Sequence, residues 1–184
     1  IDSNSTGDSA ELGEALSWPE LTVIKSNSQD ISAIRNLGAK MAIYPFVAFI
    51  DADNHWTPFF LYEMERLIRR FPGNGLYACR YQKMIDCSTY LDAKIRLTNL
   101  DPNGYEMNDY FKVAAQGELP FLLSSCVIER AYFRSIGGFP VNESVGQIQS
   151  LFVQAAADDM IAYSPQIRLS CHIGKDTHIR EKQP

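Results

Sequence analysis

The sequence predicts a single α/β domain, residues 1–184, built on an open, mostly parallel β-sheet with helices on both faces. Two observations carry this prediction. Helix and strand patterns alternate along the whole chain, which is typical of right-handed crossovers between parallel strands. The run Phe46–Ile50 is apolar without alternation, as expected of a strand that is covered on both faces. The length suits one domain with a sizeable core, and no repeat or linker divides it.

Each predicted element has a local signal in the sequence. Helices show apolar residues at helical spacing and are expected at 9–16, 31–42, 57–71, 129–138 and 145–157. Strands are short apolar runs and are expected at 21–25, 46–50, 75–81, 121–128 and 160–164. Asp30 is placed to cap the second helix, and Pro58 lies where the third begins. The polar and aromatic stretch 84–118 is interpreted as a substrate-facing excursion or a long surface loop.

Composition excludes several classes of protein. A formal net charge of −5, with Lys and Arg scattered, argues against nucleic-acid binding. No apolar run approaches the roughly 20 residues of a membrane span, and the polar start of the chain does not resemble a signal peptide. The spacing of the four cysteines fits no zinc pattern. Free thiols in a reducing, cytoplasmic compartment are expected at Cys79, Cys87, Cys126 and Cys171.

Two carboxylates, Asp51 and Asp53, follow the apolar run 46–50. On an extended segment, residues two apart project to the same side, and open α/β sheets bind ligands beyond the carboxyl ends of their strands. Mg²⁺ or Mn²⁺ relieves the repulsion between paired carboxylates and often shares them with substrate phosphates. The pair therefore indicates metal-assisted departure of a phosphate-bearing group.

Other interpretations of the same pair remain. It could be a polar strand end that caps the next helix. An EF-hand is excluded, because Trp56 and Tyr62 stand where its glycine and glutamate would be. A dehalogenase-like phosphatase would use Asp51 as its nucleophile, but it expects Thr or Val where this chain has His55.

Four segments in order along residues 1–140 resemble the family 2 glycosyltransferases of the GT-A fold. They are "IDSNSTGDS", "ISAIRNLGAKMA", "VAFIDADNHWTPFFLYEM" and "LLSSCVIERAYFRSIGGFP". The resemblance implies transfer of a sugar, with inversion, from a nucleotide-diphospho-sugar donor such as a UDP- or GDP-sugar to an acceptor hydroxyl. It also implies Mn²⁺ or Mg²⁺ as cofactor, and a place in cell-surface polysaccharide or glycolipid synthesis.

The resemblance assigns roles to five residues. Asp2 would lie near the base or ribose, Arg35 on the nucleotide side of the cleft, and Asp51 near the ribose or the metal. Asp53 would bind the metal directly, and His172 falls where many members have a His that holds the diphosphate or metal. Each has a structural alternative: Asp2 could close a turn, Arg35 could be a solvated helix charge, and a lone His after a strand is often structural.

The sequence departs from the family pattern in two places. The chain opens at the end of the family's second strand, so the sheet is expected to lack its usual N-terminal strand. Gln147 and Ile148 stand where the family has a Glu-Asp pair that supplies the general base, and neither can accept a proton. Glu143 is the candidate substitute. A catalytically silent GT-A domain that binds a donor or a partner is therefore an alternative to an active transferase.

The expected partners follow from these assignments. They are the nucleotide-sugar donor and a saccharide or lipid-linked acceptor, whose rings the aromatics of 101–111 and the segment 120–125 would contact. No nucleic acid and no membrane span are expected. A peripheral position at the inner membrane and a homo-oligomer stay open.

Overall fold

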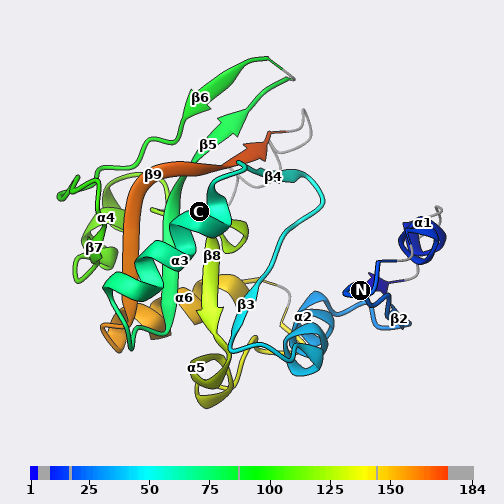
Figure 1. Cartoon of the computed structure of the whole chain (residues 1–184). Helices are drawn as coiled ribbons and strands as arrows, with labels where there is room; N and C mark the ends of the chain where they lie inside the picture. Colours follow the sequence, from blue (N-terminus) through cyan, green and yellow to red (C-terminus); the bar gives the residue numbers. More distant parts are fainter. Residues whose placement is uncertain (4–8, 17, 87, 144, 174–184) are drawn as a thin grey trace.

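The computed structural model describes residues 1–3, 9–16, 18–86, 88–143 and 145–173. Its helices are α1 (Ser9–Ala15), α2 (Ile31–Met41), α3 (Phe60–Arg70), α4 (Tyr110–Gln116), the 3₁₀ turn η1 (Leu123–Ser125), α5 (Arg130–Ser135) and α6 (Gln147–Ala157). Its strands are β1 (Asp2–Ser3), β2 (Lys25–Ser26), β3 (Phe46–Ala48), β4 (Asn54–Trp56), β5 (Leu76–Met84), β6 (Tyr90–Asp92), β7 (Tyr105–Glu106), β8 (Cys126–Glu129) and β9 (Ile161–His172). Helices and strands intermix along the chain, which confirms the α/β class (Figure 1).

The main sheet is mixed. Its strand order is β3-β8-β5-β9-β4, with β6 added beside β5 and β7 beside β9. The long ladder between β5 and β9 is parallel, as expected, and the other pairings of this sheet are antiparallel. In Figure 1, β5 and β6 extend beyond the rest of the sheet as a hairpin.

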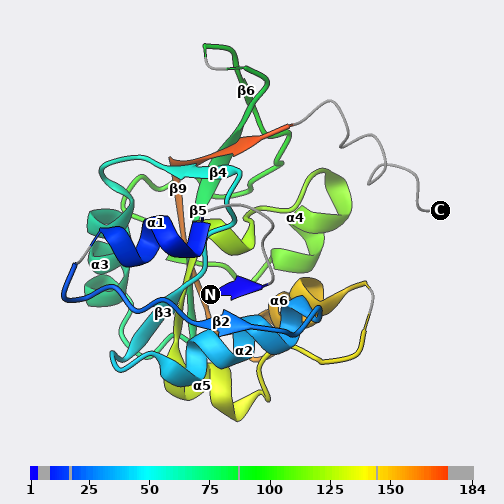
Figure 2. The ribbon, with the colours of Figure 1, turned by 90° about the vertical axis from the view of Figure 1, so that its right-hand side faces the viewer.

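Helices cover both faces of this sheet. An apolar layer lies on each face, and β5 contributes side chains to both layers. Leu76 and Ala78 face a large cluster with residues of α5 and α6, whereas Tyr77 and Cys79 face a smaller cluster with α3. Figure 2 shows α3 on one side of the strands, with α4 and α6 on the other. The alternation of side chains along a strand explains the two layers, because both faces of β5 must be apolar.

Several predicted elements have different bounds. The stretch 84–118, which was expected to be an excursion or a loop, contains β6, β7 and α4. The predicted strand 121–128 includes the 3₁₀ turn η1 before β8 begins. Of the predicted strand 21–25, only Lys25 lies in a strand. β9 runs far beyond the predicted 160–164, with a register shift against β5 beside Pro165. A bulge lets the strand pass a proline, which has no N–H to donate to the ladder.

The N-terminal segment lies beside the sheet rather than in it. β1 and β2 form a separate parallel pair, and within the described chain β3 pairs only with β8. A groove of about 460 Å³ runs along β3 and α2, with Ile1 at its wall and Arg35 and Asp51 among its lining residues.

Three cysteines are free thiols, as predicted: Cys79 and Cys126 are buried and Cys171 is half-buried. Cys87 lies outside the described residues. Among the described helices, none is both long enough and apolar enough to span a membrane.

Candidate functional site

The two aspartates of the sequence motif lie in a tight turn after β3. β3 ends at Ala48, and the N–H of Asn54 donates to the carbonyl of Asp51 at 3.0 Å. The segment is therefore not extended at this point, and the expectation that residues two apart share one side of a strand does not apply. The geometry of the turn, rather than the pleat of a strand, decides where the two carboxylates lie.

The Asp51 carboxylate forms an ion pair with the guanidinium group of Arg35. Nη2 of Arg35 donates to Oδ1 of Asp51 at 2.8 Å. The same guanidinium lies 5.8 Å from the ring centre of Phe139. Arg35 stands on α2, whose start is capped by the Asp30 carboxylate, which accepts from the N–H groups of Ser32 and Ala33 as predicted. Arg35 and Asp51 thus meet at the groove, and their contact with a nucleotide stays a prediction.

The Asp53 carboxylate is exposed and makes no hydrogen bond or ion pair with any residue that the structure describes. Its backbone carbonyl accepts from the N–H of His172 at 3.2 Å, which places the end of β9 beside the turn. Across the described ranges, no group of three or more His, Cys, Asp or Glu side chains is arranged to hold a metal ion. Asp53 and His172 are therefore neighbours through the backbone, and a shared metal remains a prediction.

Ser124 supports the turn from beneath. Its Oγ accepts from the N–H of Asp51 at 3.0 Å and from Nδ2 of Asn54 at 2.9 Å. Its carbonyl accepts from the indole N–H of Trp56 at 2.6 Å. Ser124 is 1% exposed, and Trp56 stacks on Phe60 at 4.4 Å between ring centres. Sequence reasoning missed this residue as a support; the available signal was a pair of serines inside an otherwise apolar run.

Glu143 is exposed on the loop before α6. Its carbonyl accepts a hydrogen bond from Nε2 of Gln147, and Ile148 packs against the large apolar cluster. The loop is tied to α2, since the N–H of Asn142 donates to Asp30 at 2.8 Å. This bond is the main cause that lowers the pKa of the Asp30 carboxyl. No contact joins the Glu143 side chain to Asp51 or Asp53 within the described part of the chain.

Asp2 lies in β1, where its N–H donates to the carbonyl of Ile24 at 2.8 Å. Its neighbour Ile1 shares the groove with Arg35 and Asp51. The structure thus places Asp2 at the side of the groove, and its contact with a nucleotide stays a prediction.

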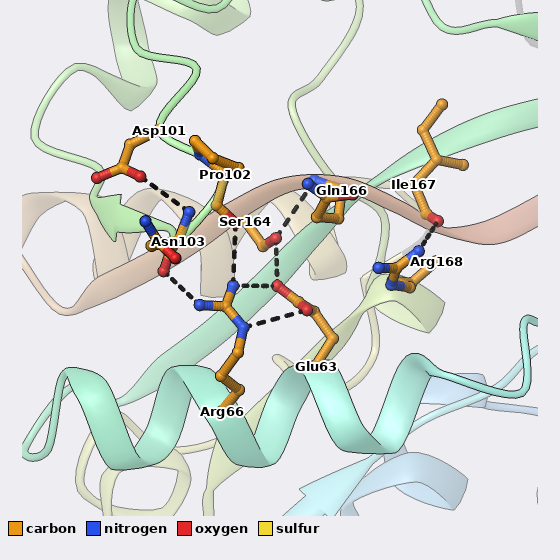
Figure 3. A network of polar contacts seen from close by, with 9 residues as sticks. All are labelled: Glu63, Arg66, Asp101, Pro102, Asn103, Ser164, Gln166, Ile167 and Arg168. Carbon is orange, nitrogen blue, oxygen red and sulfur yellow. Dashed lines mark hydrogen bonds and ion pairs between the residues drawn. The ribbon is translucent and has the colours of Figure 1, made fainter.

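A buried polar network fixes the helix that follows the turn (Figure 3). Glu63 on α3 is 3% exposed, and it accepts from Arg66 and from Oγ of Ser164 at 2.5 Å. Arg66 also donates to the carbonyl of Asn103 at 2.7 Å. The network therefore joins α3 to β9 and to the turn at 101–104, two elements far apart in sequence.

Comparisons with known proteins agree with this architecture. Residues 1–135 match the family model described as glycosyl transferase family 2. No curated protein matches the chain. A crystal structure of S. aureus TarS superposes with a TM-score of 0.68 at 14% identity, over 97% of this chain and 31% of that chain. A structure of S. aureus TarS 1-349 gives 0.64 and 16%, over 93% and 49%.

At these identities the likeness to the solved structures shows the fold alone. The chain spans less than half the length of either of them. The family match goes beyond the fold, because the matched residues 1–135 are more than half of the chain and contain Asp2, Arg35, Asp51 and Asp53.

Proposed function

Because the chain belongs to glycosyl transferase family 2, we propose that its groove and the Asp51–Asn54 turn form the donor site of a sugar transfer. The donor is a nucleotide-diphospho-sugar and the acceptor is a hydroxyl of a saccharide or a lipid-linked sugar. The observation that carries the proposal is an exposed Asp53 carboxylate, without a partner among the described residues, two positions after the Asp51 that pairs with Arg35 at the groove.

The nucleotide would enter on the side of Asp2 and Arg35. The apolar walls of the groove suit the base, and Arg35 holds the Asp51 carboxylate by a hydrogen bond at the same groove. In an inverting transfer, the acceptor oxygen forms a bond to the anomeric carbon as the bond to the diphosphate breaks. The proton of the attacking hydroxyl would pass to Glu143, which is the acid on the loop before α6.

A divalent cation fits the residues at the turn. Free carboxylate oxygens are the ligands that Mg²⁺ and Mn²⁺ prefer, and Mg²⁺ commonly takes one or two carboxylates together with substrate phosphates and water. Asp53 would hold it, with Asp51 and His172 as further contacts. When bound, the cation neutralises the charge that develops on the departing diphosphate.

One observation favours a second function, a silent domain that binds the donor without transfer. The Gln147 side chain is occupied with the Glu143 carbonyl, and Ile148 is committed to the apolar core. The segment that supplies the base in the family thus serves packing here. Glu143, on the loop before α6, is the acid proposed here to accept the proton.

Calorimetry with UDP, UDP-sugars and GDP-sugars, with and without Mn²⁺, tests the donor site. We expect metal-dependent binding that Asp53→Asn weakens by about tenfold or more, because a charge-assisted contact is lost. Glu65→Gln is the matched control, since this exposed carboxylate lies on α3 and pairs with Arg69 on the same helix. Unchanged binding in Asp53→Asn would contradict the proposed metal ligand.

Turnover separates the two functions. Release of the nucleoside diphosphate that depends on acceptor and is abolished in Glu143→Gln would support transfer. Donor binding without turnover would select the silent domain. Phosphate release from a generic ester, lost in Asp51→Asn, would instead support a phosphatase.

A further inference from the structure

Ser124 makes three hydrogen bonds to the Asp51–Asn54 turn and to the residue two positions after it. It lies in η1, immediately before β8, and its partners Asp51, Asn54 and Trp56 are about 70 positions away in sequence. A turn on the surface is mobile unless its backbone is tied to the core. These bonds tie it at its first residue, at its last residue and just beyond.

The neighbouring serine shows that this arrangement is not a general property of η1. Ser125 is also fully buried, but its Oγ accepts from the N–H of Leu122 and donates to the carbonyl of the same residue. Its hydroxyl therefore serves only the local 3₁₀ turn. Ser124 turns its hydroxyl away from its own element and toward Asp51.

The other contacts of the turn act on different atoms from the bond to Ser124. The N–H of Asn54 closes the turn on the Asp51 carbonyl, Arg35 holds the Asp51 side chain, and His172 donates its N–H to the Asp53 carbonyl, where β4 pairs with β9. Among the described residues, Ser124 is the partner through which the N–H of Asp51 is joined to another element. Ser124 is buried and Asp51 is half-buried, so an Asp51 N–H that lost this partner would be only partly open to water, and leaving it unpaired is costly.

We propose that Ser124 is a positioning residue for the donor site, whose buried hydroxyl fixes the Asp51–Asn54 turn and so presents Asp53 to a metal-bound diphosphate. The role in donor binding rests on the proposed function. The fixing of the turn does not, so the two parts can be tested separately.

The test compares Ser124→Ala with Ser125→Ala, since each removes one buried hydroxyl from the same 3₁₀ turn. Calorimetry measures UDP affinity at several Mn²⁺ concentrations, and amide hydrogen exchange by NMR follows the Asp51 N–H. We expect Ser124→Ala to weaken metal-dependent UDP binding about tenfold and to speed exchange at Asp51 by a similar factor. Ser125→Ala should leave both near the wild-type values.

Several results would overturn the proposal. Wild-type affinity together with wild-type exchange in Ser124→Ala would do so, as would an equal loss of binding in Ser125→Ala. If the wild-type protein shows no Mn²⁺-dependent UDP binding, the proposed function fails, and exchange at Asp51 still decides whether Ser124 fixes the turn. If Ser124→Ala does not fold, Ser124→Cys replaces it, because a thiol is close in size but a weak acceptor.

Discussion

At the scale of single residues, Arg35 and Asp51 form an ion pair that differs from the surface pairs of the molecule. The Arg35 side chain is only 14% exposed, whereas Arg69, which pairs with Glu65 on α3, is 78% exposed. Exposed pairs contribute about 0–1 kcal/mol, because water and salt screen them. Arg35 is largely buried while the Asp51 side chain is 42% exposed, so water screens this pair only in part and breaking it costs more than breaking an exposed pair.

We therefore expect Arg35→Met to lower the free energy of unfolding by about 1–2 kcal/mol, between the surface and buried limits. Arg69→Met is the matched control and should cost about 0.5 kcal/mol or less. Urea unfolding at low and high salt measures both. Equal losses in the two variants would show that burial does not strengthen the Arg35–Asp51 pair.

A second prediction concerns Gly104 in the turn that receives Arg66. Its φ is +81°, and a Cβ there would lie 2.9 Å from the carbonyl oxygen of Tyr163. Gly73 has a similar φ of +95°, but its Cβ would meet nothing within 4 Å. Gly73→Ala should lower the free energy of unfolding by about 1–2 kcal/mol, because alanine disfavours the left-handed backbone conformation at this position.

Gly104→Ala should cost about 3 kcal/mol or more, because the backbone of β9 cannot move aside without disturbing the sheet. Thermal unfolding of both variants measures the difference. A similar loss at the two positions would mean that β9 yields easily, and that the close approach at Gly104 is not a constraint on the turn.

At the scale of elements, Glu63 links α3 to β9. Burial by itself would raise the pKa of Glu63, but hydrogen bonds from Arg66 and Ser164 and the charges of Arg66 and Arg168 outweigh it and lower the pKa. A carboxyl with a lowered pKa in the folded state stabilises the protein above the ordinary carboxyl pKa of about 4.3. That stability is lost as the pH falls through the lower, folded-state pKa.

Glu63→Gln should therefore be less stable than the wild type at pH 7, with a difference that shrinks as the pH falls below about 4.3. Denaturant unfolding measured between neutral pH and about pH 3 tests this. Glu65→Gln, on the same helix but exposed, should show little change at either pH. A pH-independent loss in Glu63→Gln would assign the effect to packing instead of charge.

At the scale of the whole molecule, the sequence predicted the helices better than the sheet. Asp30 caps α2 as predicted because caps act locally, whereas α3 begins at Phe60, two residues after the predicted start at Pro58. The run 46–50 suggested a parallel strand, yet β3 pairs antiparallel with β8, because an apolar strand covered on both faces is compatible with either direction. The length of β9 was hidden by Pro165, which a bulge accommodates.

The candidate site shows the same division between local and distant information. Asp51, Asp53 and Arg35 were found from short motifs, and the structure joins Arg35 to Asp51. The bond between Ser124 and Asp51 joins residues 73 positions apart, and the bond between Glu63 and Ser164 joins residues 101 positions apart. Nothing local in the sequence specifies such pairings, because they depend on how the strands are ordered in the sheet.

The order of the sheet also bears on the prediction of one domain for residues 1–184. Leu67 of α3 and Leu151 of α6 are buried in different layers, and β5 contributes side chains to both. If the two layers unfold as one cooperative unit, Leu67→Ala and Leu151→Ala should each lower the free energy of unfolding by about 2–5 kcal/mol. Each should also lower the midpoint of a single calorimetric transition. Leu61→Ala, at an exposed position of α3, should change it little. Two transitions, each sensitive to only one variant, would divide the chain at β5.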